Sequence, residues 1–205
     1  MDVAHPYRAV IPSLDGDVLV ALAGTTRPLT GRQLAALAPR GSQRAVATVL
    51  DRLVDQGLVH REHAGRAYLH TLNRDHLAAP SVEALAGLRT ELLTRIRTVA
   101  AAWTIPPVAL AMFGSTARGD GDSASDIDLL VVRPAGTSAT DEGWHGQIGD
   151  LRDGVHRWTG NHAAVIDLAE EEIPALIRDE RPVVAEIRRD AIDLVGSPVR
   201  SLLRA

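Results

Sequence analysis

The chain has 205 residues, of which 45% are hydrophobic and 3% are aromatic, and it carries a formal net charge of −4. This composition excludes a disordered chain, and the length suffices for one large domain or for two small domains that each bury a core. The absence of cysteine excludes disulfides and thiolate metal sites. No apolar run approaches the length of a membrane span, and the start lacks a signal-peptide pattern. We therefore expect a cytoplasmic protein that does not bind membranes.

The first part of the chain has the pattern of helices followed by a hairpin. Apolar residues at helical spacing, with capping residues before them, predict helices at 13–24, 30–38 and 42–57. The apolar period then changes from 3.6 to 2, which predicts strands at 58–62 and 67–72. A short turn with a glycine joins the two strands.

This element order and the phrase "VLDRLVDQGLVHRE" resemble the winged helix-turn-helix domains of bacterial transcription regulators. The resemblance implies that the third helix enters the DNA major groove, that the hairpin forms a wing, and that the protein is a homodimer reading two half-sites. Gln can pair with adenine and Arg with guanine. The expected DNA-binding residues are Gln43, Arg44 and Thr48 on the helix and Arg61 and Arg66 on the wing. A wing that only binds protein is the alternative, because Asp51 and Asp55 place negative charge on the same helix.

A domain boundary is expected near residues 73–81, which divides the chain into 1–78 and 79–205. After Pro80, near-heptad spacing of apolar residues predicts one long amphipathic helix over 81–103. Such a helix could pair with its copy in a dimer or pack on the sheet of the second domain. The spacing alone favours neither arrangement.

The second domain contains the stretch "FGSTARGDGDSASDIDLLVV" at 113–132. A predicted strand at 108–113 runs into Gly114 and Ser115, where a short helix begins. Glycine at such a turn allows a phosphate to approach the free backbone amides closely. Ser115 offers a hydroxyl to the same anion, so this turn is a candidate phosphate site.

Carboxylates follow at the start of the next predicted strand, 126–132. Because side chains alternate along a strand, Asp126 and Asp128 point to the same side, about 6 to 7 Å apart. In that position they can share divalent cations with a triphosphate. A third carboxylate is expected from Asp167, which lies in the apolar strand 163–169 and would be costly to bury without a partner. Asp193 ranks well behind it.

The pattern Gly-Ser, ten residues, Asp-x-Asp, and a later apolar-Asp-apolar strand resembles the nucleotidyltransferases of the DNA polymerase β superfamily, particularly the minimal nucleotidyltransferases. The resemblance spans about 85–196 and implies an α/β (α+β) domain with a small mixed sheet flanked by helices. It also implies that Asp126, Asp128 and Asp167 are catalytic and hold two Mg²⁺ ions, which Mn²⁺ could replace. Gly114 and Ser115 would bind phosphates, with Arg118 as a secondary contact.

The implied function is Mg²⁺-dependent transfer of an NMP group from an NTP, most simply ATP, to a hydroxyl of protein or RNA. In the minimal family such enzymes often act beside a helical toxin as its antitoxin, and the winged helix would suit autoregulation. The alternative is a nucleotide-responsive DNA-binding regulator with little or no catalysis. An aminoglycoside-modifying enzyme is a third reading, which the short domain and the DNA-binding module do not favour.

Overall fold

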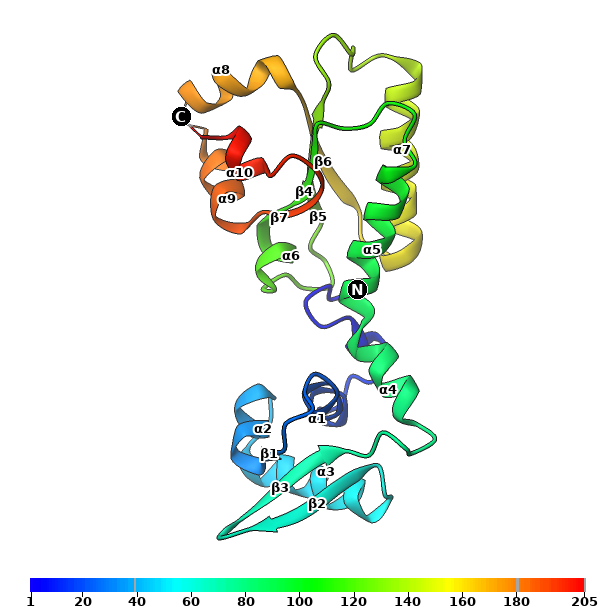
Figure 1. The fold of residues 1–205 in the computed structure, drawn as a ribbon, viewed down its shortest axis with the longest axis vertical. Helices are drawn as coiled ribbons and strands as arrows, with labels where there is room; N and C mark the ends of the chain where they lie inside the picture. Colours follow the sequence, from blue (N-terminus) through cyan, green and yellow to red (C-terminus); the bar gives the residue numbers. More distant parts are fainter. Residues whose placement is uncertain (39, 180, 205) are drawn as a thin grey trace. The chain divides into compact units, whose positions relative to one another are not determined.

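The computed structural model describes residues 1–38, 40–179 and 181–204. The chain divides into two compact units, one formed by Pro6–Leu88 and the other by Met1–His5 together with Arg89–Ala205 (Figure 1). The first unit is called here the N-terminal unit, and the second the C-terminal unit. No helix in the described part of the chain is both long and apolar enough to cross a membrane.

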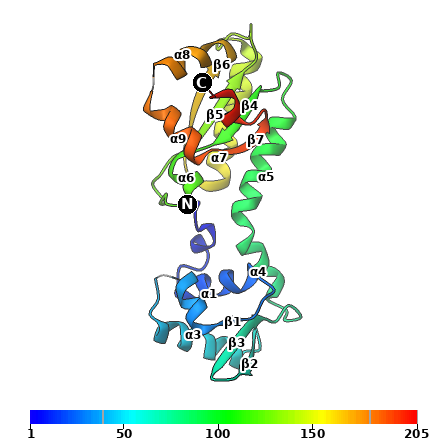
Figure 2. The ribbon, with the colours of Figure 1, turned by 60° about the vertical axis from the view of Figure 1, so that its left-hand side comes forward.

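The N-terminal unit packs helices against one face of a small antiparallel sheet, with strand order β1-β3-β2 (Figure 2). Its apolar core contains Leu22, Leu34, Leu50 and Leu72. The side chains of Thr30 and Ser42 cap the second and third helices. The elements are η1 (Pro6–Ala9), α1 (Leu14–Ala23), β1 (Leu29–Thr30), α2 (Gly31–Leu37), α3 (Gln43–Asp55), β2 (Val59–Ala64), β3 (Ala67–Leu72) and α4 (Ala79–Ala86).

The prediction of a single helix over 81–103 is wrong. The structure has two helices there, α4 and α5 (Leu88–Ala101), and the residue between them is Gly87. The amide of Gly87 donates to the carbonyl oxygens of Glu83 and Ala84, which closes the last turn of α4. Glycine is about 1 kcal/mol less favourable than alanine inside a helix, so it is a natural point for the break.

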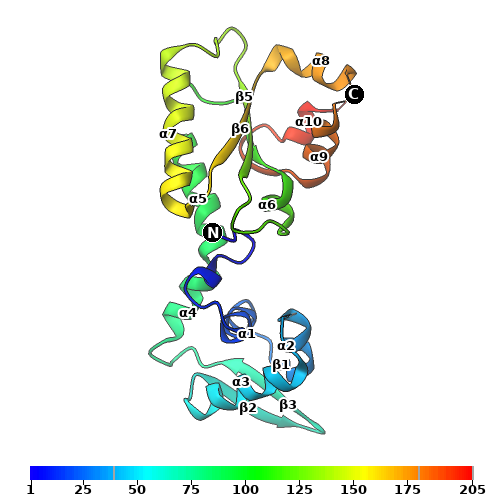
Figure 3. The ribbon, with the colours of Figure 1, turned by 180° about the vertical axis from the view of Figure 1, so that it is seen from behind.

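The C-terminal unit is a mixed sheet with helices on both faces, as predicted for this part of the chain. The strand order is β6-β5-β4-β7, in which β5 and β6 run parallel and the other neighbours antiparallel. Helices α5 and α7 cover one face, and α8, α9 and α10 lie on the other (Figure 3). The further elements are β4 (Ala109–Met112), α6 (Gly114–Arg118), β5 (Ile127–Arg133), α7 (Glu142–Thr159), β6 (Ala163–Ala169), η2 (Glu170–Glu172), α8 (Ile173–Arg178), α9 (Pro182–Asp190), β7 (Ile192–Gly196) and α10 (Val199–Leu202).

Alternation along β5 sends its side chains into two separate cores. Ile127, Leu129 and Val131 are buried with α5 and α7. Leu130 and Val132 are buried with the helices of the opposite face. Because both faces are covered, the strand is apolar throughout its centre. Its polar residues therefore lie at its ends, and this arrangement positions the candidate site.

Candidate active site

The turn between β4 and α6 brings Gly114 against the side chain of Asp128. Gly114 has φ +70°, a conformation that L side chains rarely adopt. A Cβ atom built on Gly114 would lie 2.2 Å from Asp128 Oδ2. The antiparallel pairing of β4 with β5 fixes this approach, since the amide of Phe113 donates to the carbonyl of Asp128 at 3.0 Å. Only glycine leaves room for the carboxylate here.

Asp126 and Asp128 flank Ile127, the first residue of β5. Asp126 immediately precedes the strand, and its carbonyl accepts a hydrogen bond from Thr116 Oγ1 at 3.2 Å. No described residue donates a hydrogen bond to either carboxylate, and no described cation pairs with either. Burial raises the pKa of Asp128, the negative charges of Asp126 and Glu186 add to this rise, and Arg118 opposes it. This corner of the sheet is therefore negative, partly desolvated and able to accept a cation.

The third predicted carboxylate, Asp167, does not join the other two. In the parallel pairing of β5 with β6, Asp167 lies opposite Val131, three residues along the strand from Asp128. Residues paired in this way point to the same face, so Asp167 shares the α7 face with Val131, whereas Asp128 points to the other face. Trp144 Nε1 donates to Asp167 Oδ2 at 3.0 Å, and Arg133 Nη1 lies 2.6 Å from Oδ1. The structure thus surrounds Asp167 with an indole N–H and a buried guanidinium.

Ala164 occupies the sheet position beside Asp128. The two residues are register partners on parallel strands, so their side chains point to the same face. This is the position on β6 nearest to Asp128, so a carboxylate standing here would join it most directly. Sequence reasoning missed this position because the apolar-Asp-apolar pattern identifies a strand but not its register against β5.

A metal ion fits the two carboxylates at the start of β5 on the donor chemistry. Carboxylate oxygens without a hydrogen-bond donor are the ligands that Mg²⁺ and Mn²⁺ prefer. Among residues 1–38, 40–179 and 181–204, however, no group of three His, Asp or Glu side chains is placed to hold a metal ion. Two carboxylates from the chain, with the remaining positions left to phosphate oxygens and water, match the usual Mg²⁺ pattern.

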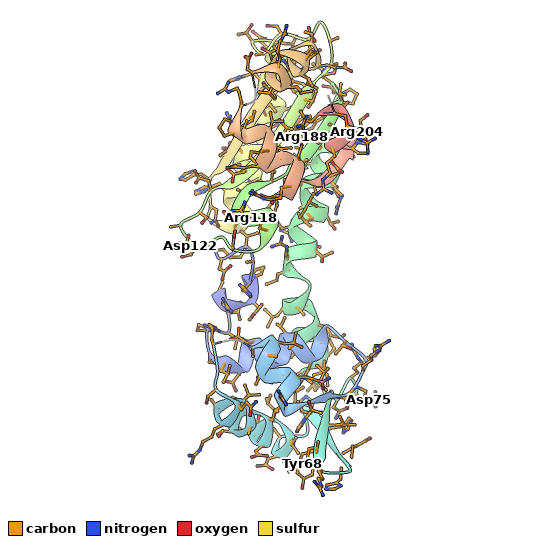
Figure 4. All side chains as sticks on the ribbon, turned by 90° about the vertical axis from the view of Figure 1, so that its left-hand side faces the viewer. Tyr68, Asp75, Arg118, Asp122, Arg188 and Arg204 are labelled. Atoms are coloured by element: carbon orange, nitrogen blue, oxygen red, sulfur yellow. The ribbon has the colours of Figure 1, made fainter. Side chains whose placement is uncertain are left out.

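Arg118 and Ser115 follow Gly114 on α6. Arg118 Nε lies 3.0 Å from Asp120 Oδ2, and its Nη1 lies 2.6 Å from Asp190 Oδ2. Figure 4 shows Arg118 on α6 near the loop that carries Asp122. Hydrogen bonds from Arg189 and Arg118 outweigh desolvation and lower the pKa of Asp190 to about 2. A phosphate would have to compete with these carboxylates for Arg118, while Ser115 is only half-buried.

Asp193, the weaker sequence candidate, serves a structural purpose. It lies on β7 opposite Ala111, and its Oδ1 accepts a hydrogen bond from the amide of Val199 at 2.9 Å. This bond satisfies a free amide at the start of α10. Asp193 therefore caps a helix on the described chain.

The residues expected to contact DNA lie on two elements of the N-terminal unit. On α3, Gln43, Arg44 and Thr48 are exposed, and Thr48 Oγ1 donates to the carbonyl of Arg44 at 3.1 Å. On the hairpin, Arg66 is exposed in the turn. The fifth, Arg61, is already engaged: its Nη1 lies 2.5 Å from Asp51 Oδ1, and its guanidinium carbon lies 5.1 Å from the centroid of the Tyr68 ring.

Comparison with known proteins shows which family the chain belongs to. The model of the nucleotidyltransferase domain matches residues 96–201, about half of the chain. No curated protein matches the chain. Similar solved structures include a toxin–antitoxin with AMP-PNP, at 17% identity and a TM-score of 0.38, covering 54% of this chain and 80% of that one. Another is a protein from Sulfolobus solfataricus described as a nucleotidyltransferase, at 22% identity and a TM-score of 0.26. The match covers 51% of this chain and 83% of that one.

Both TM-scores are low, so neither structure supports an argument about function. The domain match spans β4, α6, β5 and β6, and the matched residues include Gly114, Asp126 and Asp128. The chain belongs to the nucleotidyltransferase domain family and is an enzyme of that class.

Proposed function

We propose that the enzyme transfers an NMP group from an NTP to a hydroxyl of a protein or RNA, using Asp126 and Asp128 as the carboxylates that hold a divalent cation. One observation carries the proposal: two carboxylates to which no described residue donates stand at the start of β5, and one of them occupies the space that a side chain at Gly114 would fill. ATP is the expected donor and Mg²⁺ the expected cation, with Mn²⁺ as a substitute.

The chemistry follows from this arrangement. The oxygen of the acceptor hydroxyl attacks the α-phosphorus in line, the hydroxyl proton passes to water, and the bond to pyrophosphate breaks so that pyrophosphate leaves. A bound divalent cation would neutralise charge on the phosphate oxygens. Asp126 and Asp128 would position this cation. Gly114 and Ser115 would allow the phosphates to lie close to the backbone of α6. Arg118 would meet the phosphates only after loosening its contacts with Asp120 and Asp190.

Asp128→Asn tests the site. We expect it to lower label transfer from [α-³²P]ATP, measured with Mg²⁺ and cell extract as the source of acceptors, by at least about 100-fold. A residue that only supports a metal ligand typically contributes 10- to 100-fold, so a ligand itself should contribute no less. The control Asp153→Asn changes an exposed carboxylate on α7 and should leave transfer unchanged. Full transfer by a folded Asp128→Asn enzyme would contradict the assignment.

A second candidate function is nucleotide sensing, in which NTP binding rather than transfer is the main output. The presence of Ala164 beside Asp128 and the pairing of Asp167 with Arg133 favour it, because the expected third carboxylate does not join the site. Among the residues that the structure describes, no group of three His, Asp or Glu side chains is placed to hold a metal ion. This candidate predicts tight ATP binding, measured by calorimetry, with transfer too slow to detect. Rapid transfer to any acceptor would argue against it.

We further propose that the N-terminal unit is a winged helix-turn-helix domain that binds DNA, with α3 as recognition helix and the β2–β3 hairpin as wing. The order of α1, α2 and α3 and the antiparallel β1-β3-β2 sheet support this assignment. The exposed Gln43, Arg44 and Thr48 would face the bases, and Arg66 a phosphate, while Arg61 would have to exchange Asp51 for DNA. A homodimer, autoregulation and a helical toxin-like partner belong to the same proposal.

DNA binding is testable with a matched pair of arginines on α3. Arg44→Gln should lower affinity for random-sequence duplex DNA by about 10-fold, because an exposed cation near the helix start is lost. Arg52→Gln should have little effect, since Arg52 pairs with Asp15 on α1. Fluorescence anisotropy at several salt concentrations gives the affinities. Equal losses in both variants, or an affinity independent of salt, would contradict the proposal.

A further inference from the structure

Two side chains from different elements hold the backbone on either side of Asp126. Asn161 Nδ2 donates at 2.9 Å to the carbonyl of Ser125, which belongs to the peptide group before Asp126. Thr116 Oγ1 donates at 3.2 Å to the carbonyl of Asp126, which belongs to the peptide group after it. Because peptide groups are planar, holding both of them fixes the two backbone dihedrals of Asp126. The direction in which its carboxylate leaves the chain is fixed with them.

Asn161 is buried, and its surroundings determine how its amide is oriented. The residue is 4% exposed and follows Gly160, which ends α7 with a φ of +76°. Its backbone amide donates to Thr159 Oγ1 at 3.0 Å, and its Oδ1 accepts from the amine of Met1 at 2.6 Å. A donor therefore faces the amide oxygen and carbonyls face the amide nitrogen, as the side chain requires.

The bond from Asn161 joins an exposed loop to the buried end of α7. Within the loop, Ser125 Oγ donates to Asp122 Oδ1 at 2.9 Å, so this turn is closed locally (Figure 4 labels Asp122). Asn161 Nδ2 also lies 3.4 Å from the carbonyl of Ser123. Asp126 is the last residue of the loop before β5. Its position therefore depends on how the loop is attached to the unit.

We propose that Asn161 is a positioning residue for nucleotidyl transfer, which together with Thr116 holds Asp126 so that its carboxylate meets the same cation as that of Asp128. This inference rests on the proposed function of the two carboxylates. Asn161 and Thr116 act through Asp126 and do not bind the cation themselves. Residues that orient a metal ligand in this way typically contribute 10- to 100-fold to metal affinity or activity.

Asn161→Leu tests the role of the amide on the full chain. Leucine has a similar branched shape but lacks the donor that meets the carbonyl of Ser125. We expect it to weaken the binding of Mn²⁺, added without nucleotide and measured by electron paramagnetic resonance, by about 10-fold. Asn73→Leu is the matched control, because it removes an amide that donates to the carbonyl of Gly57 at 2.8 Å in the N-terminal unit. It should leave Mn²⁺ affinity unchanged.

Thr116 allows the same test without a change of shape. Thr116 is 2% exposed, and Thr116→Val replaces its hydroxyl with a methyl group of similar size. Thr116→Val should weaken Mn²⁺ binding by about 10-fold, whereas Thr116→Ser, which keeps the donor, should restore the affinity to within about 2-fold of wild type. Circular dichroism verifies the folds. This pair remains a valid test if Asn161→Leu does not fold.

The dependence of label transfer on Mg²⁺ distinguishes positioning from a general structural role. Both Asn161→Leu and Thr116→Val should raise the Mg²⁺ concentration for half-maximal transfer by about 10-fold, with the KM for ATP at saturating Mg²⁺ unchanged. A general loss of folded protein would lower transfer at every Mg²⁺ concentration instead. Equal reductions at all Mg²⁺ concentrations would therefore overturn the inference.

The Mn²⁺ measurement also separates this inference from the proposed function. Asp128→Asn should lose Mn²⁺ binding, which shows that the ion measured is the one at the candidate site. Wild-type protein that binds no Mn²⁺ would contradict the metal site itself and the inference with it. Mn²⁺ bound by wild type, lost in Asp128→Asn, and bound with unchanged affinity by Asn161→Leu and Thr116→Val would overturn the inference alone.

Discussion

At the scale of single residues, the candidate site depends on a glycine that makes room for a carboxylate and on two acids that pair with no described residue. Gly114 is required because a Cβ atom would overlap the carboxylate of Asp128 and because its φ is positive. No described residue donates to Asp126 or Asp128, and Asp128 is partly buried although burial of an unpaired carboxylate is unfavourable. Ionisable residues that lack hydrogen-bond or charge partners in the protein alone are often those that bind a ligand.

Ala164 allows the role of a third carboxylate to be tested by gain of function. Its Cβ stands beside that of Asp128, at roughly the 5 Å spacing of adjacent strands. We expect Ala164→Asp to raise Mg²⁺-dependent label transfer by about 10-fold, because an additional oxygen ligand would hold the cation more firmly. Ala164→Asn, which has nearly the same volume without the charge, is the control. If both variants fold and transfer at the wild-type rate, Ala164 is not at the metal site.

At the scale of elements, a buried carboxylate on α1 connects separate segments of the N-terminal unit. Asp17 is 3% exposed and accepts hydrogen bonds from Tyr7 at 2.7 Å and from Arg40 at 2.8 Å, with Arg8 also in contact. Burial alone would raise the pKa of Asp17, but the hydrogen bonds and the two guanidinium charges hold the pKa below 3.8. Burial, with the hydrogen bond and charge of Asp17, raises the pKa of Tyr7 to about 12.

The pKa of Asp17 predicts how stability depends on pH. Its pKa is lower in the folded state than in the unfolded state, so its contribution is complete above pH 3.8 and is lost as the pH falls through the folded-state value. Asp17→Asn should lower the free energy of unfolding at pH 7 by about 3 kcal/mol, because two arginines lose a buried partner. The difference from wild type should shrink below pH 3.8. Urea unfolding followed by circular dichroism measures it.

The exposed Asp55→Asn on α3 is the matched control for Asp17→Asn. It should change the free energy of unfolding by less than about 0.5 kcal/mol, as surface substitutions usually do. A difference between Asp17→Asn and wild type that stays constant from pH 7 down to pH 3 would contradict the role assigned to the ionised carboxylate.

At the scale of the whole molecule, the first residues of the chain belong to the C-terminal unit. Val3 is 3% exposed and packs in the core formed with α5 and α7. Arg89 on α5 connects the first residues with α6, because its guanidinium donates to the carbonyls of Val3 and Thr116. The enzyme unit is therefore assembled from two segments that are separated by the whole N-terminal unit.

Tryptophan fluorescence can test this assembly, since Trp103, Trp144 and Trp158 all belong to the C-terminal unit. Val3→Ala should destabilise that unit by about 2 kcal/mol through loss of buried methyl groups, and should lower the urea midpoint detected by tryptophan. Val10→Ala, at a site that is 65% exposed, should leave this midpoint unchanged. Equal midpoints for Val3→Ala and wild type would mean that Val3 does not stabilise the core.

The sequence alone determined the three N-terminal helices, the hairpin and the enzyme class. Periodicity and capping residues identified the N-terminal helices, and the Gly-Ser and Asp-x-Asp spacing led to the nucleotidyltransferase domain that the family match confirms. These signals are local, because neighbouring residues set a helix, a turn and a motif. The break at Gly87 was missed because heptad spacing continues across it.

Only the tertiary structure decided which side chains meet. Asp167 and Asp128 both stand in apolar strands, and the sequence does not state how those strands are aligned. A shift of one residue in register exchanges the two faces of a strand. The observed register sends Asp167 to Arg133 and Trp144 and places Ala164 beside Asp128. The Gly-Ser and Asp-x-Asp motif is local, so it could be recognised in the sequence. The residue of β6 that stands beside Asp128 is set by packing between distant segments, so the sequence alone could not predict it.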